Sequence, residues 1–477
     1  MDRLSRVIKP FPKRPIKVVQ FGEGNFLRAF VDPFIQTLNE KGLFDGNVAV
    51  IQPMPQGRVR DLEQQDGLYT LILEGIDQGK VVSERKIVDV LSEFIDPYTQ
   101  YKAYLDLAAS PIITTVVSNT TEAGIAFMNE IVHFNQCPTS FPGKLLAFLR
   151  MRFEVFAGAK EAGLDILACE LIDDNGQTLK KVLIDMARYN NMSETFIHWM
   201  TTANRFYNTL VDRIVPGYPK QDANQLEAEF GYLDHSMVKG EIFHLWVIEG
   251  ENGLNTRLPF DQAGLNVYFV DVLKPYKERK VKILNGSHTA LVPIAYLCGI
   301  DTVKEAVTDP QIGQFIQNLI WQEVIPTIDL PQADMDKFAK AVLERYLNPF
   351  VRHELMSIAL NAMSKYKSRI LPSILNQLDH GKFPNLQLFS LAATIVFYRG
   401  KRNNETIKLQ DDPQFLELYQ QLWSKGDVKE VVQTILGLPH WETTRLSQPD
   451  VLSYVYQHVE AILNMGMRDA LQHVLEA

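Results

Sequence analysis

The feature that most restricts the possible folds is a short apolar segment, Lys17–Phe21, followed by a glycine-containing turn and an amphipathic helix to about Lys41. The turn reads Gly22-Glu23-Gly24, and glycines at such a turn let a backbone approach a pyrophosphate beside the helix start. The third glycine of the usual fingerprint is replaced by Leu27. The pattern therefore predicts the first strand and helix of a dinucleotide-binding unit, with an ordinary tight turn as the alternative.

Further strands are expected at Asn47–Ile51, Pro111–Ser118 and Asp165–Cys169. In an open α/β sheet ligands lie beyond the carboxyl ends of the strands, so the loop after Ser118 is a candidate for contact with a nicotinamide. Its polar residues are Asn119, Thr120 and Glu122. The alternative is a polar loop that caps the following helix. Gln52 stands where an acid usually binds the ribose, which leaves the choice between NAD and NADP open.

The second half of the chain has helical periodicity, apart from the strand-like residues 267–272. Expected helices are Val303–Gln317, Met335–Tyr346, His353–Lys365, Leu386–Tyr398, Asp412–Ser424 and Val451–Leu475. The predicted fold class is α/β plus α: a Rossmann-type dinucleotide-binding domain over residues 1–265, then a mostly α-helical substrate and catalytic domain over residues 266–477.

Composition excludes several classes of protein. The 48 Lys and Arg against 57 Asp and Glu give a net charge of −9, so nucleic acid is not an expected partner. The three cysteines are far apart, and Asp173-Asp174 lacks a nearby histidine, so neither disulfides nor a metal is expected. The polar, proline-broken amino terminus and the absence of a long apolar run argue against a secretory signal and a membrane partner. We expect a cytoplasmic protein; its oligomeric state stays open.

Three polar residues between Lys274 and Cys298 are the best candidates for chemistry. At roughly 100° per residue, a helix would project Lys280, Asn285 and His288 over one broad sector. Reducing a ketone requires a proton donor and a fixed hydrogen-bond donor for the developing oxyanion. A lysine whose pKa is lowered by burial and nearby cations can supply the proton. The alternative is a basic helix start followed by a buried segment with a satisfied core histidine.

The chain resembles the mannitol dehydrogenase family of zinc-independent, polyol-specific dehydrogenases over nearly its whole length. The resemblance is carried by residues 22–30 (GEGNFLRAF), by Val211-Asp212-Arg213-Ile214 and by Lys280-x4-Asn285-Gly286-Ser287-His288. The longer strings SNTTEAGI, TLVDRIV and ILNGSHTALVP are similar to the tagaturonate reductase branch, also called altronate dehydrogenase.

This resemblance implies an NAD-dependent oxidoreductase that interconverts D-tagaturonate and D-altronate in hexuronate catabolism. It makes Lys280 the general acid/base, with Asn285 and His288 orienting the substrate. The implied NAD-binding segment comprises Val18, Val19, Gln20, Phe21, Gly22, Glu23, Gly24, Asn25, Phe26, Leu27, Arg28 and Ala29. Alternatives are a fructuronate reductase, a mannitol-type polyol dehydrogenase, and a non-catalytic NAD-binding protein.

The substrate of that branch is a small-molecule hexuronate or aldonate, and its carboxylate requires a cation. Lys277, Arg279, Lys282 and Arg369 are candidates, because arginine binds carboxylates in bidentate fashion; solvated helix charges are the alternative. Asp212, beside Arg213 in an apolar stretch, is a further candidate for substrate binding or for a structural ion pair. Mannitol dehydrogenases carry an oxyanion-binding Asn where this chain has Leu171, which favours a different substrate.

Overall fold

The computed structural model describes residues 1–250, 253–402 and 405–476, without the side chain of Glu122. It separates into two compact units, one made of residues 1–74 and 82–273 and the other of residues 75–81 and 274–477. The functional boundary predicted at residues 265/266 stays a prediction, because compactness does not assign a role to either part. None of the helices within the described ranges is long and apolar enough to cross a membrane.

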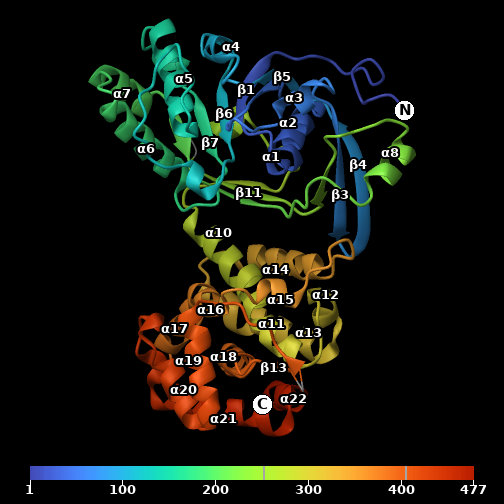
Figure 1. Cartoon of the computed structure of the whole chain (residues 1–477), viewed down its shortest axis with the longest axis vertical. Helices are drawn as coiled ribbons and strands as arrows, with labels where there is room; N and C mark the ends of the chain where they lie inside the picture. The colour runs from blue at the N-terminus through green and yellow to red at the C-terminus, as the bar shows by residue number, and fades with distance from the viewer. Residues whose placement is uncertain (251–252, 403–404, 477) are drawn as a thin grey trace. The chain divides into compact units, whose positions relative to one another are not determined.

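The first unit contains, in its described part, a six-stranded sheet whose strands pair in parallel (Figure 1). Its order is β5 (Leu91–Ile95), β2 (Asn47–Ile51), β1 (Ile16–Phe21), β6 (Thr115–Ser118), β7 (Asp165–Ala168) and β8 (Arg205–Tyr207). The chain moves outward in one direction from β1 to β2 and in the other from β6 to β8. The switch point of this Rossmann-type topology therefore lies between β1 and β6, where ligands bind in such sheets.

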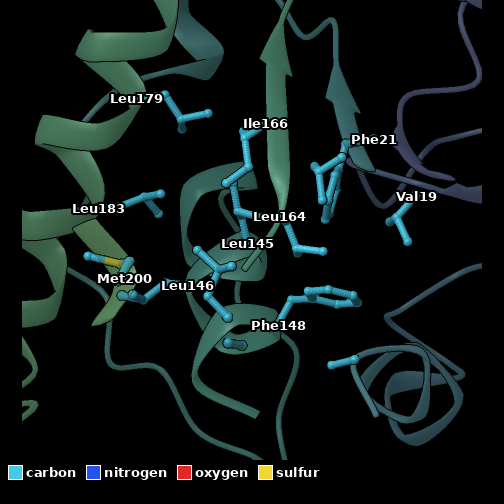
Figure 2. Close-up of a cluster of buried hydrophobic side chains, with 14 of the residues drawn as sticks. Val19, Phe21, Leu145, Leu146, Phe148, Leu164, Ile166, Leu179, Leu183 and Met200 are labelled. Atoms are coloured by element: carbon cyan, nitrogen blue, oxygen red, sulfur yellow. The ribbon is translucent and has the colours of Figure 1, made fainter. Parts of the chain in front are cut away.

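Both faces of the sheet are buried, which explains the nearly continuous apolar strands. Val19 and Phe21 of β1 point into one core with residues of β7, α5 and α6, as Figure 2 shows. Val18 lies in a second core on the opposite face, because successive side chains of a strand alternate. The turn after Phe21 is thus anchored on two sides.

Helices cover the sheet, and the same unit contains two separate three-stranded sheets in its described part, β10-β3-β4 and β12-β11-β9. The helices are α1 (Asn25–Ala29), α2 (Val31–Glu40), α3 (Val59–Glu63), α4 (Tyr101–Leu107), η1 (Glu122–Gly124), α5 (Phe141–Val155), η2 (Lys160–Ala162), α6 (Asn175–Tyr189), α7 (Glu194–Thr202), α8 (Ala223–Phe230) and α9 (Leu254–Arg257). The remaining strands are β3 (Tyr69–Asp77), β4 (Lys80–Val88), β9 (Thr209–Asp212), β10 (Val238–Glu241), β11 (Leu245–Glu249) and β12 (Val267–Val270). The tip that joins β3 to β4 groups with the second unit.

The expectation of one continuous helix to Lys41 was wrong, because α1 ends at Ala29 and α2 starts at Val31. Pro33 lacks the N–H that would bond to the Ala29 carbonyl in a continuous helix. That carbonyl accepts instead from Arg213 Nη1 at 2.5 Å, and the Arg28 carbonyl accepts from Tyr69 Oη at 2.7 Å. Two side chains that are remote in sequence therefore supply hydrogen-bond donors to the two carbonyls at the break.

Asp32, in the first turn of α2, is fully buried. Burial raises its pKa to about 7, although hydrogen bonding to Tyr69, the charge of Arg28 and the amide of Gln20 oppose the rise. The folded state therefore binds more protons at this carboxyl than the unfolded state does between the unfolded pKa and about pH 7. Stability is lost as the pH rises through this window, and the loss is complete above it.

Asp32→Asn should remove this dependence. The stability advantage of the variant over the parent should grow by about 2–3 kcal/mol between pH 5 and pH 8, at 1.36 kcal/mol per pKa unit. Urea or thermal unfolding at both pH values measures it, and Asp185→Asn, on the exposed side of α6, is the matched control. An advantage for Asp32→Asn that does not change with pH would contradict the assignment.

The second unit is almost entirely helical. Its elements are α10 (Lys274–Arg279), η3 (Lys280–Gly286), α11 (Ser287–Leu297), α12 (Val303–Thr308), α13 (Pro310–Asn318), η4 (Leu319–Val324), η5 (Ile325–Thr327), α14 (Gln332–Tyr346), α15 (Leu355–Ile358), α16 (Ala362–Arg369), α17 (Leu371–Asp379), α18 (Asn385–Phe397), β13 (Lys401–Arg402), β14 (Glu405–Thr406), α19 (Pro413–Lys425), α20 (Val428–Leu436), η6 (Pro439–Trp441), η7 (Arg445–Ser447), α21 (Pro449–Met465) and α22 (Met467–Glu476). α11 and α18 pack against each other, and both are buried on nearly all sides. A helix that is apolar all round is typical of a core position.

Three of the expected helices are each divided in two. Asp309 ends α12 and caps α13, whose first residue is Pro310; Asn361, with φ of +53°, separates α15 from α16. Gly466, with φ of +88°, separates α21 from α22. The expected strand Pro111–Ser118 is likewise shorter, because only Thr115–Ser118 pairs within the sheet. These breaks follow local turn chemistry inside an otherwise correct helical pattern.

Candidate active site

In the first unit, the turn after β1 and the loop after β6 meet at the switch point of the sheet. Gly22 has φ of +123°, which favours glycine, and a Cβ there would lie 3.4 Å from the carbonyl oxygen of Asn119. A Cβ on Gly24 would meet no atom within 4 Å. The turn thus combines a close backbone approach at Gly22 with open space at Gly24, which fits a dinucleotide.

The predicted cofactor residues divide into those that support the turn and those that are accessible. Val18, Val19, Phe21, Leu27 and Ala29 belong to the two cores and position the turn. Gly24 and Asn25 are exposed, and Glu23 and Phe26 are half-buried. These last four residues are available for contact.

Two buried polar side chains fix the shape of the turn. Gln20 donates from Nε2 to the Gly22 carbonyl at 3.0 Å. Arg28 donates to the Glu23 carbonyl at 3.0 Å and to Asn25 Oδ1 at 2.7 Å, and it also bonds the Ser236 carbonyl. The Arg28 guanidinium is therefore occupied by the protein, and its role is to hold the turn.

The loop after β6 is fixed by Glu170, which follows β7. Its carboxylate accepts from the Thr120 N–H at 3.0 Å, from the Thr120 hydroxyl at 3.1 Å and from the Ser118 hydroxyl at 3.1 Å. Burial raises the pKa of Glu170 despite these donors. Asn119 donates to the Cys169 carbonyl at 2.6 Å. The backbone of Glu122 lies in η1, and its side chain is outside the described residues.

A cavity of about 850 Å³ opens beside the turn. It is lined by the turn and α1, by the loop after β2 with α3, and by the two loops that flank α8. The polar lining residues are Glu23, Asn25, Arg28, Gln56, Arg58, Asp61, Tyr218, Lys220, His235 and Ser236. Its position at the carboxyl ends of β1 and β2 is where Rossmann-type sheets bind the adenosine half of a dinucleotide.

In the second unit, Lys280 and Asn285 lie in a π-helical segment, η3, between α10 and α11. A π-helix bonds residue i to residue i+5, so these two residues come closer to one side of the helix than the α-helical spacing predicted. Both side chains are half-buried. Such π segments are frequent at functional sites.

Tyr346, at the end of α14, supports this segment. Its hydroxyl bonds the Leu284 carbonyl at 2.7 Å and the Ser287 hydroxyl at 2.7 Å, and its ring stacks on His288 with centroids 4.1 Å apart. The ring of His353 makes an edge-to-face contact with the imidazole, with centroids 5.1 Å apart. The His288 ring therefore contacts two other aromatic rings.

His288 is not a satisfied core histidine. Its Nε2 is buried and has no hydrogen-bond partner among the residues that the structure describes. Burial lowers its pKa well below the usual value for histidine, and neighbouring groups lower it further: His353, Arg345 and Arg369. The imidazole is thus neutral at physiological pH, and its Nε2 keeps an unused hydrogen-bonding position.

Arg369 reaches this site from the end of α16. A Cβ on Gly286 would lie 3.1 Å from the Arg369 carbonyl oxygen, so the glycine of the motif permits the close approach. The guanidinium donates to the Thr289 hydroxyl at 3.3 Å and has no carboxylate partner within the described part of the chain. Burial lowers its pKa. Arg345, Tyr346 and His353 were missed from the sequence, which carries no local signal for them.

Other predicted cations have structural positions. Lys282 bonds Glu278 at 3.2 Å and the Thr327 carbonyl at 3.0 Å. Arg279 is buried against the rings of Tyr276 and Phe338. Lys277 is half-buried in α10 and has its own protein interaction. These positions leave Arg369 as the strongest candidate for an anion site.

The Asp212–Arg213 pair lies in the first unit, at the end of β9. Arg213 donates to the carbonyls of Ala29 at 2.5 Å, Phe243 at 3.1 Å and Ile242 at 3.2 Å, so it joins three segments. Asp212 is 6% exposed and has protein interactions of its own. Leu171 is 65% exposed and offers no hydrogen-bond donor from its side chain.

The comparisons match both parts of the chain. The family model for the mannitol dehydrogenase Rossmann domain matches residues 16–262, and that for the mannitol dehydrogenase C-terminal domain matches residues 272–463. The chain belongs to the mannitol dehydrogenase family. The resemblance and the fold class predicted from the sequence are therefore confirmed. This family member is an oxidoreductase that acts on a CH–OH group and uses a nicotinamide cofactor.

Full-length relatives are named altronate oxidoreductase. That of Yersinia enterocolitica serotype O:8 / biotype 1B (strain NCTC 13174 / 8081) is 45% identical over 480 residues, and the match covers 99% of each chain. That of Klebsiella pneumoniae (strain 342) is 44% identical with the same coverage.

Two solved structures share the fold of this family member. A substrate-free D-sorbitol dehydrogenase matches with a TM-score of 0.84 and 22% identity, covering 98% of this chain and 100% of the other. Pseudomonas fluorescens mannitol 2-dehydrogenase, in a ternary complex with NAD and D-mannitol, matches with a TM-score of 0.67 and 23% identity, covering 99% of each chain.

Proposed function

We propose that this chain is an NAD-dependent altronate oxidoreductase that interconverts D-tagaturonate and D-altronate in hexuronate catabolism. The observation that carries the proposal is the 45% identity to altronate oxidoreductase over 99% of both chains. The free cysteines Cys137, Cys169 and Cys298 suit the reducing cytoplasm that the proposal includes.

Lys280 is the proposed general acid/base. Reduction of the ketone delivers a proton to the carbonyl oxygen, and oxidation of the alcohol removes it; both occur at Lys280 Nζ. The π segment presents Lys280 together with Asn285, whose amide can donate to the same oxygen. Asn285 thus orients the carbonyl while Lys280 exchanges the proton.

His288 supplies a neutral contact to the substrate. Because its imidazole is uncharged and its Nε2 lacks a protein partner, it can bond a substrate hydroxyl or the reacting oxygen. The stacked ring of Tyr346 holds its orientation. Asn285 and His288 together replace the donor that is missing at Leu171.

The nicotinamide cofactor supplies or accepts the hydride when it is bound. The residues proposed to hold it are the accessible part of the first turn, Glu23, Gly24, Asn25 and Phe26, and the backbone of Asn119 and Thr120. The turn fits a dinucleotide because Gly22 permits the close backbone approach and Gly24 leaves open space.

Arg369 is the proposed ligand of the substrate carboxylate, with Arg345 adding positive charge. Both guanidinium groups are close enough to lower the pKa of His288, so an anion beside this histidine would meet two cations. Lys277 and Asp212 stay secondary candidates for substrate contact.

The proposal predicts a clear substrate preference. Purified protein with NADH should reduce D-tagaturonate at least about 10²-fold more efficiently, in kcat/KM, than D-fructose, because only the hexuronate engages the arginines. D-fructuronate, run in parallel, tests the nearest alternative. A preference for fructuronate or fructose would reject the assigned substrate and retain the chemistry, whereas inactivity on all three would favour a non-catalytic cofactor-binding protein.

A further inference from the structure

Glu23 brings a carboxylate to the end of β2, where the sequence lacks an acid. Its Oε1 accepts from the backbone N–H of Arg58, in the loop after β2, at 2.9 Å. A Cβ on Gly57 would lie 2.5 Å from this same oxygen and 2.2 Å from Gln52 Cγ. The carboxylate of Glu23 and the side chain of Gln52 thus flank the same glycine, although they come from different strand ends.

Gln52 itself does not present an acceptor to a ligand. It is 3% exposed, and its amide lies 3.4 Å from the Pro55 carbonyl oxygen and 3.4 Å from the Val59 N–H. Its polar atoms are directed into its own loop. The position that usually binds the ribose therefore serves to shape the loop.

The second carboxylate oxygen of Glu23 lacks a donor. Oε2 is buried and has no hydrogen-bond partner within the residues described, while Glu23 lines the cavity of about 850 Å³ beside the turn. A buried carboxylate oxygen without a donor is costly, and such atoms in native proteins call for a ligand or water. A hydroxyl group of a bound ligand would satisfy it.

We propose that Glu23 accepts hydrogen bonds from the adenosine ribose hydroxyls of the dinucleotide and thereby selects NAD over NADP. This inference rests on the proposed function, which requires a dinucleotide in the first unit. The acid that a Rossmann-type site places after its second strand comes here from the turn after the first.

The charges around the loop favour an unphosphorylated ribose. A 2′-phosphate adds about two negative charges at neutral pH and would lie beside Glu23 and Asp61. Arg58 and Arg28 are nearby cations that line the cavity. The Arg58 side chain is 76% exposed and is bonded to Asp61 at 2.6 Å, and the Arg28 guanidinium is bonded to the Glu23 carbonyl and to Asn25 Oδ1. Lys220 and His235 line the cavity from other loops and are exposed. Repulsion at Glu23 is therefore incompletely balanced.

The test is equilibrium binding of NADH and NADPH to the full chain, without substrate, by dinucleotide fluorescence. The parent should bind NADH more tightly than NADPH. Glu23→Gln should weaken the binding of NADH by about tenfold, because the amide is a poorer acceptor than the carboxylate. It should strengthen the binding of NADPH, because the negative charge beside the 2′-phosphate is removed. The Kd for NADPH divided by the Kd for NADH should therefore fall by about 10²-fold. AMP and 2′-AMP, as competing probes, should show the same change.

Two further variants separate this role from a structural one. Glu63→Gln removes an exposed carboxylate that pairs with Arg60 on α3 and should leave both affinities unchanged. Glu23→Asp keeps the charge but moves the carboxylate oxygens away from the ribose. The binding of NADH should therefore weaken, and the binding of NADPH should not improve. Circular dichroism and thermal unfolding verify that each variant is folded.

The outcomes are distinct. If Glu23→Gln changes both affinities by the same factor, or if the parent prefers NADPH, the role of Glu23 in selection is rejected and the proposed oxidoreductase stands. If Glu23→Gln does not fold, an NADH affinity of Glu23→Asp equal to that of the parent rejects the role. If the parent binds neither dinucleotide, the proposed function fails together with the inference.

Discussion

Replacing Lys280 by alanine is expected to lower kcat for tagaturonate reduction by on the order of 10²–10⁴, because the proton donor to the carbonyl oxygen is lost. The affinity for NADH should change little, since Lys280 lies in the second unit and the proposed dinucleotide residues lie in the first. Steady-state kinetics with fluorescence titration of NADH separates the two quantities.

A matched control distinguishes catalysis from general disturbance of the helix. Lys274 is exposed at the start of α10, six residues before Lys280, and Lys274→Ala should keep near-normal kcat. Partial rescue of Lys280→Ala by small primary amines would support proton transfer at this position. Near-normal turnover of Lys280→Ala without rescue would remove Lys280 from the mechanism.

Replacing Arg369 by methionine should have the second largest effect, and it should depend on the substrate. Loss of a charge-assisted hydrogen bond to the carboxylate costs about 1.5–3 kcal/mol, which corresponds to about 10–150-fold in kcat/KM for tagaturonate. The slow turnover of fructose, which has no carboxylate, should stay within about threefold of the parent. Measuring both substrates on one preparation gives the comparison.

Arg399→Met is the control for this substitution, because Arg399 is exposed beyond the end of α18. It should not change kcat/KM for either substrate. Equal losses on tagaturonate and fructose in Arg369→Met would assign Arg369 to packing against Thr289 and Gly286. The carboxylate would then have to be bound elsewhere, with Arg345 or Lys277 as the next candidates.

The position of His288 bears on both experiments. Its pKa is held well below neutrality by burial and by the cations beside it. A pH dependence of kcat near neutrality should therefore not arise from His288 in the parent. In Arg369→Met one of these cations is absent, so the pKa of His288 moves upward, and the pH profile provides a further check on the proximity of the two residues.

The sequence by itself determined the features that depend on neighbouring residues. Apolar strands followed by turns predicted the Rossmann-type sheet, because both faces of a parallel sheet are buried and its strands are continuously apolar. The Gly22-x-Gly24 turn and the Lys280-x4-Asn285-x2-His288 spacing could also be recognised in the sequence, because each consists of residues that are near one another in the chain. Helical periodicity predicted the second unit but not its breaks at Asp309, Asn361 and Gly466.

Tertiary structure decided the features that depend on residues far apart in the chain. The helix after Gly24 breaks where Tyr69 and Arg213 satisfy its carbonyls, and the π segment at Lys280 is supported by Tyr346, about sixty residues away. Arg345 and His353 approach His288 in the same way. The acid after β2 is missing from its usual place in the sequence, and folding supplies one from Glu23. Local periodicity indicates which face of an element is buried, but only the folded chain shows which polar groups come together on that face.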